Sequence, residues 1–466
     1  MQVVKCGEVV EATRGRLISG GSHVEFSNIS TDSRSIKAGE LFVPIKGEKF
    51  DGHDFIADAF MAGAAGTLTH RNVGYLIKGN DERIFKDKVI IEVDDTRKAL
   101  NDLAYCYRKK FTIPFIGITG SVGKTSTKDM TACVLMQEYN VLKTPGNFNN
   151  DIGVPLTIFR LEPCHEAAVL EMGMNAPGEI SRLTSIVQPK IAIITNVGMS
   201  HIGKLGSRQN ILKAKMEIIE GVPRDGLVIL NGDDNLLYGL KGLLDRRTVF
   251  FGMDEGVDYQ VCNIQNAGES GVYFDTNIKG IEYNIHIPVP GVHNIYNALA
   301  AIAVGVEMGL TMDSIIEGIK QFKPDEMRLN VLLHEGIKII NDAYNASPQS
   351  MEAALRVLKD VNGCKRRIAV LGDMLELGDW AHNAHFNAGK LSVSLGIDYI
   401  VTVGENGRII AEGALKSGAS PDRVKSFTDN KSAIDFLRGF IESNDAILVK
   451  GSRGMGMEEI ARELMR

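Results

Sequence analysis

The sequence predicts an α/β protein of three domains, on three observations. The chain has 466 residues, which suits about three domains of roughly 100–200 residues each. Short apolar runs alternate with helical stretches in two separate parts of the chain, a pattern typical of parallel sheets covered by helices. A glycine-rich loop follows the first apolar run of the middle part. We expect domains at residues 1–112, 113–322 and 323–466.

The N-terminal segment, residues 1–112, has the weakest pattern of the three. An apolar run at 41–45 precedes a turn-rich stretch at 47–55. Residues 96–110 have the apolar spacing of a helix and precede Pro114. We expect this helix to lead into the second domain.

The central segment opens with a short apolar strand candidate at 114–120 that ends in glycine. Two more strand candidates follow, one at 168–170 ending at Glu171 and one at 191–194, with helical stretches between them. This alternation predicts a parallel sheet with helices on its faces. Residues 255–290 indicate a small antiparallel patch, and 291–309 a strongly apolar helix.

The C-terminal segment repeats the alternation, with strand candidates at 337–340, 368–371, 399–403 and 447–449. A helix should begin at Ser347 and Pro348, because serine is a favoured N-cap and proline suits the first helical turn. This segment therefore predicts a second, Rossmann-like open sheet.

Composition and charge exclude several classes of protein. The net charge of −6 gives no indication of a nucleic-acid partner, although a local basic site could still bind small anions. The six cysteines stand singly, without the paired spacing of a zinc site, and suit a reducing compartment. The N-terminus has no signal-peptide pattern, and no segment approaches the ~20 apolar residues of a membrane span. We expect a cytoplasmic protein with no membrane partner.

The sharpest motif is the loop at 120–125, Gly-Ser-Val-Gly-Lys-Thr, between a strand and a helix. Glycines let several backbone N–H groups face one anion, and the helix N-terminus adds partial positive charge. Lys124 would reach the terminal phosphates and Thr125 would hold Mg²⁺. The strict spacing of the common P-loop fails here, so an ordinary glycine-rich turn is the alternative. The expected ATP-binding residues of the loop are Thr119, Gly120, Ser121, Val122, Gly123, Lys124, Thr125 and Ser126.

Charged side chains follow the next two strand candidates of the central segment. Glu171 ends one strand, and His201 lies in the loop 196–207 after the other. Because parallel strands end at the same sheet edge, both side chains should lie near the phosphates. Each alone would more often be an ordinary loop residue. In the helical stretch 211–221, Lys213 suits a solvated face, whereas Lys215 is open to either interpretation.

Together these residues resemble the muramyl ligases, the ATP-dependent ligases of peptidoglycan precursor synthesis, along essentially the whole chain. Residues 144–155 look like the family's asparagine-rich loop, 171–180 and 196–203 like its metal-site segments, and 213–218 like the helix whose lysine is carbamylated. The resemblance implies ATP and two Mg²⁺ ions. It implies catalytic roles for Lys124, Glu171, His201 and Lys215, and a metal site of Thr125, Glu171, His201 and carbamylated Lys215.

Further positions follow from the same resemblance. It implies that Asn294 contacts the adenine, with Asn297 a weaker candidate, and that Arg328 and Asp342 reach the nucleotide from the third domain. Residues 31–55 look like the domain that binds the UDP substrate. For 51–54, a plain turn and a ligand contact remain equal alternatives. The implied substrate-binding residues are Ser33, Arg34, Asn147, Asn149, Asn150, Tyr344 and Asn345.

Within the family, residues 341–351, 372–378 and 450–458 are similar to the dipeptide-adding member. That similarity implies UDP-N-acetylmuramoyl-tripeptide and D-alanyl-D-alanine as substrates of a monomer. Ser347 departs from the family pattern, in which asparagine is commoner. The alternatives are a sibling ligase (the third-residue-adding or folylpolyglutamate type) and, more distantly, a P-loop kinase. A GTPase switch would need an Asn-Lys-x-Asp sequence, which does not follow the loop.

Overall fold

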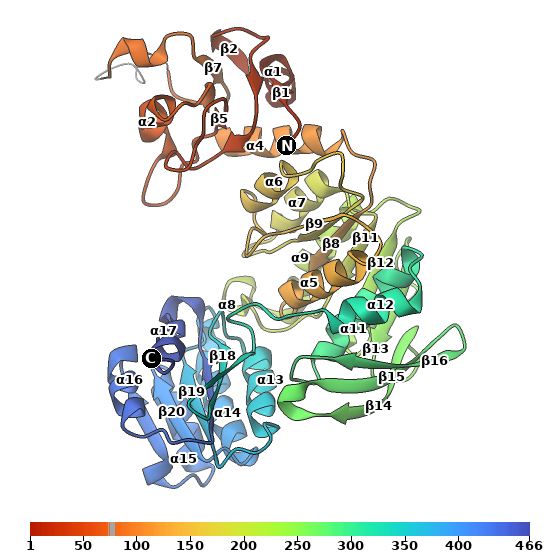
Figure 1. Cartoon of the computed structure of the whole chain (residues 1–466), viewed down its shortest axis with the longest axis vertical. Helices are drawn as coiled ribbons and strands as arrows, with labels where there is room; N and C mark the ends of the chain where they lie inside the picture. Colours follow the sequence, from red (N-terminus) through yellow and green to blue (C-terminus); the bar gives the residue numbers. More distant parts are fainter. Residues whose placement is uncertain (73, 75–79) are drawn as a thin grey trace.

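Three large sheets with covering helices, and one further two-stranded pair, make up the described chain, which is known from a computed structural model (Figure 1). The structure describes residues 1–72, 74 and 80–466. Figure 1 shows the N-terminal and C-terminal domains at opposite ends, with the central domain between them. The predicted fold class, an α/β protein with three sheet domains, is confirmed.

The N-terminal domain has a five-stranded sheet in the order β2-β7-β6-β5-β4 and a separate β1-β3 pair. Its long last helix, α4, is capped by Asp95, whose carboxylate accepts from the N–H groups of Arg97 and Lys98. The elements are β1 (Val4–Lys5), α1 (Cys6–Thr13), β2 (Arg16–Ser19), β3 (Glu25–Phe26), β4 (Ile29–Ser30), β5 (Leu41–Phe42), η1 (Gly52–Phe55), α2 (Ile56–Met61), β6 (Gly66–Thr69), η2 (Glu82–Phe85), β7 (Val89–Glu92) and α4 (Thr96–Arg108).

The central domain has a nine-stranded sheet in the order β16-β15-β14-β13-β12-β11-β8-β10-β9, parallel from β9 to β14. β15 and β16 continue it as the predicted antiparallel patch. The strands are β8 (Phe115–Thr119), β9 (Val141–Lys143), β10 (Ala167–Glu171), β11 (Ile191–Ile194), β12 (Leu227–Asn231), β13 (Arg247–Gly252), β14 (Tyr259–Asn266), β15 (Val272–Ile278) and β16 (Ile281–Ile287).

Helices cover both faces of this sheet, because its strands are apolar on both sides. One face packs on α5, α11 and α12 and the other on α4, α6, α7 and α9. The helices are α5 (Lys124–Leu135), α6 (Gly153–Ile158), α7 (Glu179–Val187), α8 (Ile202–Leu205), α9 (Arg208–Met216), η3 (Glu217–Gly221), α10 (Asn235–Tyr238), η4 (Gly268–Ser270), α11 (Asn294–Glu307) and α12 (Met312–Lys320).

The C-terminal domain is an open sheet in the order β17-β18-β22-β19-β20-β21, parallel except for β17. Ser347 caps α13, as predicted, by accepting from the Ser350 N–H. The elements are β17 (Asn330–His334), β18 (Ile337–Asp342), α13 (Pro348–Lys359), β19 (Arg366–Gly372), η5 (Gly378–Trp380), α14 (Ala381–Ser394), β20 (Tyr399–Val403), α15 (Gly407–Lys416), η6 (Pro421–Arg423), β21 (Val424–Phe427), α16 (Asn430–Arg438), β22 (Asp445–Lys450), η7 (Arg453–Met455) and α17 (Glu458–Glu463).

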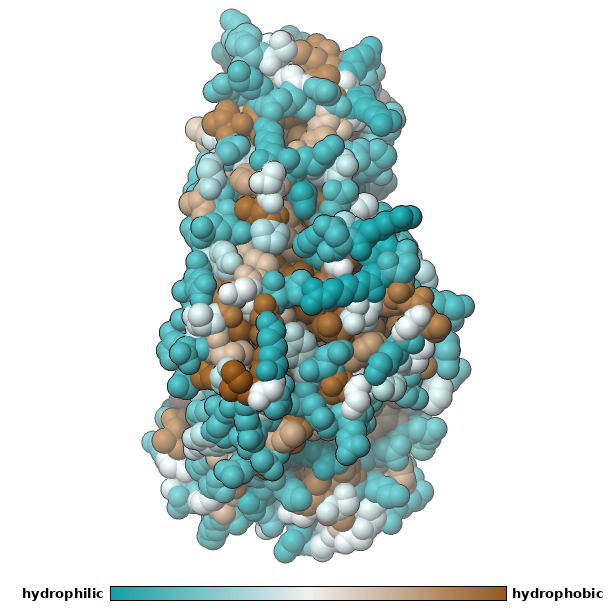
Figure 2. Space-filling model, turned by 90° about the vertical axis from the view of Figure 1, so that its right-hand side faces the viewer, coloured by the Kyte–Doolittle hydropathy of each residue, from teal (hydrophilic) through white to brown (hydrophobic). Residues whose placement is uncertain are grey.

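The surface is mixed in character. On the face shown in Figure 2, hydrophobic side chains form scattered groups among hydrophilic ones. Phe50, Leu243 and Leu333 are the most exposed large hydrophobic residues of the described chain, and they lie in three different domains. None of the described helices has both the length and the apolar character needed to cross a membrane.

Candidate functional site

A cavity of about 760 Å³ opens at the carboxyl ends of β8, β10 and β11 and extends to the C-terminal domain. Ligands bind at such strand ends in open α/β sheets. Most of the residues predicted from sequence line it. They are Ser121, Val122, Gly123, Lys124, Thr125, Ser126, Asn149, Asn150, Glu171, His201, Asn294, Arg328, Asp342, Tyr344 and Asn345.

Six predicted residues do not line this cavity. Thr119 and Gly120 lie beneath the loop at the end of β8, and Asn147 lies just before the lining asparagines. Lys215 is buried in α9. The other two, Ser33 and Arg34, belong to the distant N-terminal domain, where Arg34 forms a two-pronged pair with Asp32.

The glycine-rich loop connects β8 to α5, as its sequence predicted. Gly120 and Gly123 have φ of 153° and 85°, so both positions favour glycine. A Cβ on Gly120 would lie 1.8 Å from Thr195 Oγ1. The Lys124 ammonium donates to the Gly120 carbonyl at 2.9 Å and so lies across its own loop. Burial lowers the pKa of Lys124, and nearby Glu171 opposes that shift.

Asn196 holds the loop in place, a role that sequence reasoning missed. Its side chain accepts from the Val122 N–H at 3.0 Å and donates to the Val122 carbonyl at 2.9 Å. Thr195 Oγ1 donates to the same carbonyl at 2.6 Å. The clamp pairs a loop after β8 with the residues after β11. This contact could have been predicted only from the fact that β8 and β11 are neighbours in the sheet. The sequence does not show which strands are neighbours.

Glu171 is buried at the end of β10, with 2% of its surface exposed. One carboxylate oxygen accepts from the Thr125 hydroxyl at 2.8 Å and the other from the Asn149 amide at 2.7 Å. Neutral donors alone hold this carboxylate, so its negative charge is uncompensated by a direct ion pair among the described residues. Such a group suits a cation at the phosphate end of the cavity.

Lys215 is the most unusual charged residue of the site. Its side chain is buried, whereas Lys213, two residues earlier, is exposed as predicted. None of the described residues forms a hydrogen bond or ion pair with its ammonium group. Burial lowers its pKa far below the ordinary value, and the charge of Lys124 lowers it further. The neutral amine is therefore favoured.

The C-terminal domain contributes a buried ion pair to the cavity. Lys450 Nζ lies 2.5 Å from Asp342 Oδ2 and donates to the Asn345 carbonyl at 2.9 Å. The Arg328 guanidinium stacks on Tyr344, with its carbon 4.0 Å from the ring centroid. Sequence reasoning gave Lys450 no role, although it is the first residue of the segment 450–458 that resembles the dipeptide-adding member. Asp342 is thus already paired within its own domain.

The asparagine predicted to contact adenine lies at the start of α11. Asn294 donates to the Pro290 carbonyl at 2.8 Å and accepts from Asn297 at 2.9 Å. Asn297 accepts in turn from Thr127 of α5 at 2.9 Å. The pair therefore ties α11 to the helix that follows the phosphate loop. Adenine contact by Asn294 stays a prediction.

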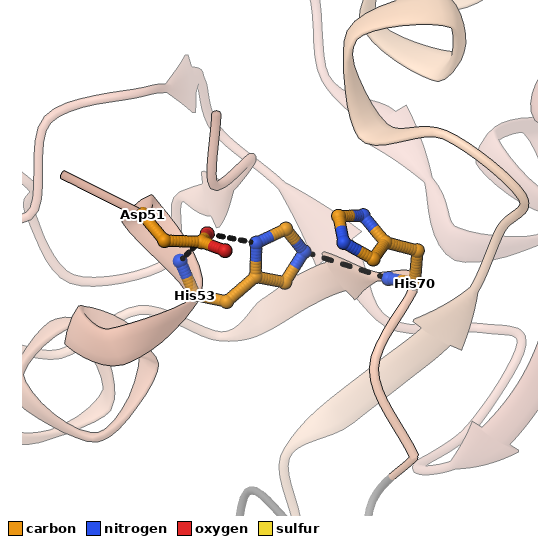
Figure 3. Close-up of side chains that lie close together, drawn as sticks. All are labelled: Asp51, His53 and His70. Atoms are coloured by element: carbon orange, nitrogen blue, oxygen red, sulfur yellow. Dashed lines mark hydrogen bonds and ion pairs between the residues drawn. The ribbon is translucent and has the colours of Figure 1, made fainter. Parts of the chain in front are cut away.

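Asp51, His53 and His70 form a compact cluster in the N-terminal domain (Figure 3). His53 lies between the other two: Nδ1 is 2.7 Å from Asp51 Oδ1, and Nε2 accepts from the His70 N–H at 3.5 Å. Asp51 also pairs with Arg71 at 2.7 Å. Because both nitrogens of His53 and both oxygens of Asp51 have partners, the cluster acts as a support for the turn. For 51–54, these contacts favour the turn over a ligand contact.

The burial of His53 predicts an acid-sensitive N-terminal domain. Burial lowers its pKa below the ordinary 6.5, so the unfolded chain binds the extra proton first and stability falls as pH drops below about 6.5. Hydrogen exchange, corrected for intrinsic rates, should show less protection of this domain at pH 5.5 than at 7.5. His53→Asn should flatten that difference, while exposed His23→Asn should keep it. Equal pH dependence in both variants would contradict the explanation.

The fold and site define a P-loop nucleotide enzyme whose cavity is completed by a second α/β domain. Three family models match the chain: the Mur ligase family catalytic domain at 25–108, the Mur ligase middle domain at 118–305, and the Mur ligase glutamate ligase domain at 327–453. The chain belongs to the Mur ligase family.

Individual relatives agree along the full length. UDP-N-acetylmuramoyl-tripeptide–D-alanyl-D-alanine ligase of Bacillus subtilis is 43% identical, over 94% of this chain and 93% of that protein. The crystal structure of MurF from Acinetobacter baumannii has a TM-score of 0.90 at 32% identity, covering 100% and 99% of the two chains. MurF ligase from Thermotoga maritima in complex with ADP has a TM-score of 0.82 at 28% identity, covering 94% and 97%.

Proposed function

We propose that this protein is an ATP-dependent ligase that joins D-alanyl-D-alanine to UDP-N-acetylmuramoyl-tripeptide in peptidoglycan precursor synthesis. The observation that carries the proposal is the 43% identity to a relative of that name over nearly the whole of both chains. The cavity supports it, because phosphate-loop residues and C-terminal residues line one space. The protein acts as a cytoplasmic monomer with domains at 1–112, 113–322 and 323–466.

The residues beside the phosphate loop fit two Mg²⁺ ions. The Thr125 hydroxyl and Glu171 carboxylate offer oxygen ligands, and His201 lines the same cavity. Lys215 fits a carbamate, because a buried amine that is neutral can react with CO₂ to give an anionic group. Bound Mg²⁺ would neutralise charge that builds on phosphate oxygens.

The chain's own residues bind and orient three substrates around that centre. Lys124 and the N–H groups of 121–126 hold the ATP phosphates, and Arg328, Asp342 and Asn294 hold the nucleoside. In the N-terminal domain, Ser33 and Arg34 bind the UDP end of the acceptor. The acceptor's peptide and the dipeptide contact two groups of residues: Asn149 and Asn150 of the cavity, with Asn147 just before them, on one side, and Tyr344 and Asn345 on the other.

The reaction follows in two balanced steps. An oxygen of the tripeptide carboxylate attacks the γ-phosphorus of ATP, which releases ADP and forms an acyl phosphate. The dipeptide amine then attacks the acyl carbon, and the tetrahedral intermediate expels phosphate, which carries away the proton lost by the amine nitrogen and leaves an amide. Lys124 and Arg328 stabilise the negative charge that develops on oxygen in both steps. Holding the reactants aligned could contribute on the order of 7–11 kcal/mol.

Phosphate release from ATP with UDP-N-acetylmuramoyl-tripeptide tests the proposal. We expect release that depends on D-alanyl-D-alanine, with a product heavier than the acceptor by one dipeptide less water. Release driven by a single amino acid would instead assign a sibling ligase. A stable phosphorylated product without any amine would assign a kinase. Omitting the acceptor is the control, and no acceptor-dependent release with any amine would refute the proposed ligase activity.

A further inference from the structure

The loop that carries His201 meets the C-terminal domain chiefly at Glu376, and also at Gln349, whose side chain accepts from the Met199 N–H at 3.3 Å. Glu376, in the loop between β19 and η5, places Oε2 2.7 Å from His201 Nδ1. Its other carboxylate oxygen lies 3.4 Å from the ammonium group of Lys204. The Gly203 N–H donates to the Glu376 carbonyl at 3.2 Å. Glu376 thus contacts three residues of one short segment through both its side chain and its backbone.

Both partners of this contact have an unfavourable backbone conformation. His201 has φ of 62° and Glu376 has φ of 63°, in the left-handed region that side chains rarely adopt. Such conformations persist only where surrounding contacts hold them, and they cluster at functional sites. The two strained residues face each other across the domain boundary. The surrounding structure therefore holds both loops in the conformations that this contact requires.

Two glycines allow this close approach. A Cβ on Gly203 would lie 2.7 Å from the Glu376 carbonyl and 2.8 Å from the Gly378 nitrogen. Gly378, with φ of 55°, would place its own Cβ 3.1 Å from the Gly203 Cα. Any side chain at either position would push the loops apart. The two segments are shaped to dock at the distance that the carboxylate contact needs.

The chemistry of imidazole gives this contact a role. The carboxylate lies 2.7 Å from Nδ1 as an ion-pair contact that lacks the alignment of a hydrogen bond, and its negative charge favours hydrogen on Nδ1, which leaves the lone pair on Nε2. His201 lines the cavity beside Glu171 and Lys124. Outer carboxylates of this kind fix the orientation of metal-binding histidines and typically contribute about 10–100-fold to metal affinity or activity.

We propose that Glu376 is a positioning residue that orients His201 for metal binding, so that the second metal position is complete only when the C-terminal domain is docked. The inference rests on the proposed function, because that function assigns the metal to His201. It adds a residue from another domain that touches neither substrate nor metal.

The test compares Glu376→Ala and Glu376→Gln with Glu335→Ala. Glu335 is the matched control: an exposed glutamate with φ of 46° in the β17–β18 turn of the same domain. The Glu376→Gln variant would keep the size of the side chain and an oxygen beside Nδ1, without the charge. Mn²⁺ affinity, from the electron paramagnetic resonance signal of free Mn²⁺ in the presence of ADP, is the readout that does not depend on turnover.

The chain provides its own reporter of docking. Trp380 is its single tryptophan, it lies in η5 four residues after Glu376, and 47% of its surface is exposed. Its emission therefore reports whether the loop stays docked on α8. Steady-state kinetics separate kcat from KM for the dipeptide.

We expect Glu376→Ala to lower Mn²⁺ affinity and kcat about 10–100-fold, with KM for the dipeptide within about twofold. Glu376→Gln should keep wild-type Trp380 emission and recover part of the Mn²⁺ affinity, and Glu335→Ala should match the wild type. Wild-type Mn²⁺ affinity in both Glu376 variants would overturn the inference, as would changed Trp380 emission with unchanged affinity. A wild-type protein that binds no Mn²⁺, or joins no amine, would instead refute the proposed function.

Discussion

Replacing Lys215 by alanine should lower turnover on the order of 10³-fold, the scale of losing a main electrostatic group at a reaction centre. The lysine is buried without a partner in the described part of the chain, and burial lowers its pKa far below the ordinary value. The amine is therefore ready for carbamylation, and its loss would remove the anion that we propose for the metal site. Initial rates of phosphate release measure the effect.

Two further measurements assign the loss to the carbamate. Formate or acetate should partly restore turnover to Lys215→Ala, because a small carboxylate can enter the space left by the side chain. Carbon-13 nuclear magnetic resonance with labelled bicarbonate should show a carbamate signal in the wild type and none in the variant. Exposed Lys213→Ala is the control and should keep wild-type rates. Full activity of Lys215→Ala would end the role proposed for this lysine.

Gly120→Ala should disrupt the phosphate loop. The new Cβ would lie 1.8 Å from Thr195 Oγ1, and that hydroxyl supports the loop by donating to the Val122 carbonyl. Relief of the overlap requires the loop or β11 to shift. We expect a loss of about 1–3 kcal/mol in the free energy of unfolding, the usual cost of overpacking. Calorimetric titration should show a loss of nucleotide binding at the same time.

Gly309→Ala separates overlap from backbone strain. Gly309 has φ of 83°, and a Cβ there would meet nothing within 4 Å. The control should therefore cost about 1–2 kcal/mol through conformation alone and leave nucleotide binding intact. Equal nucleotide affinity of the Gly120→Ala and Gly309→Ala variants would contradict this prediction. It would mean that the close contact with Thr195 does not affect nucleotide binding.

Strand positions were readable from the sequence wherever burial on both faces of a sheet produced an uninterrupted apolar run. The runs at 191–194 and 399–403 are β11 and β20 with the same bounds. The phosphate loop was readable because strand, glycines and helix are adjacent in the chain. The helix predicted at 211–221 was less accurate: α9 begins at Arg208, behind a Ser207 cap, and the stretch from Glu217 is a 3₁₀ helix.

Contacts between distant segments could not be read in the same way. Whether Lys215 is buried depends on which side of α9 meets the sheet. Lys215 is buried, whereas Lys213, two residues earlier on the same helix, is exposed. Asn196 and Glu376 act through partners about 75 and 175 residues away in the chain. Their roles follow from strand order and domain docking, which local pattern does not determine. The roles of Ser33 and Arg34 stay predictions.

The C-terminal domain is attached to the central domain in three places. The chain itself crosses at 323–329, and the turn after β14 is joined by Glu269 to Lys338 and the Asn362 N–H. The third place is the His201 segment, which is held by Glu376 and by Gln349, whose side chain accepts from the Met199 N–H at 3.3 Å. Three points fix the orientation of a body, whereas two leave it free to turn about the line between them. Release of Glu376 and Gln349 together would therefore convert a fixed joint into a hinge. The C-terminal domain could then rotate about the line through the connecting chain and the β14–β15 turn. This rotation would open the cavity on the His201 side.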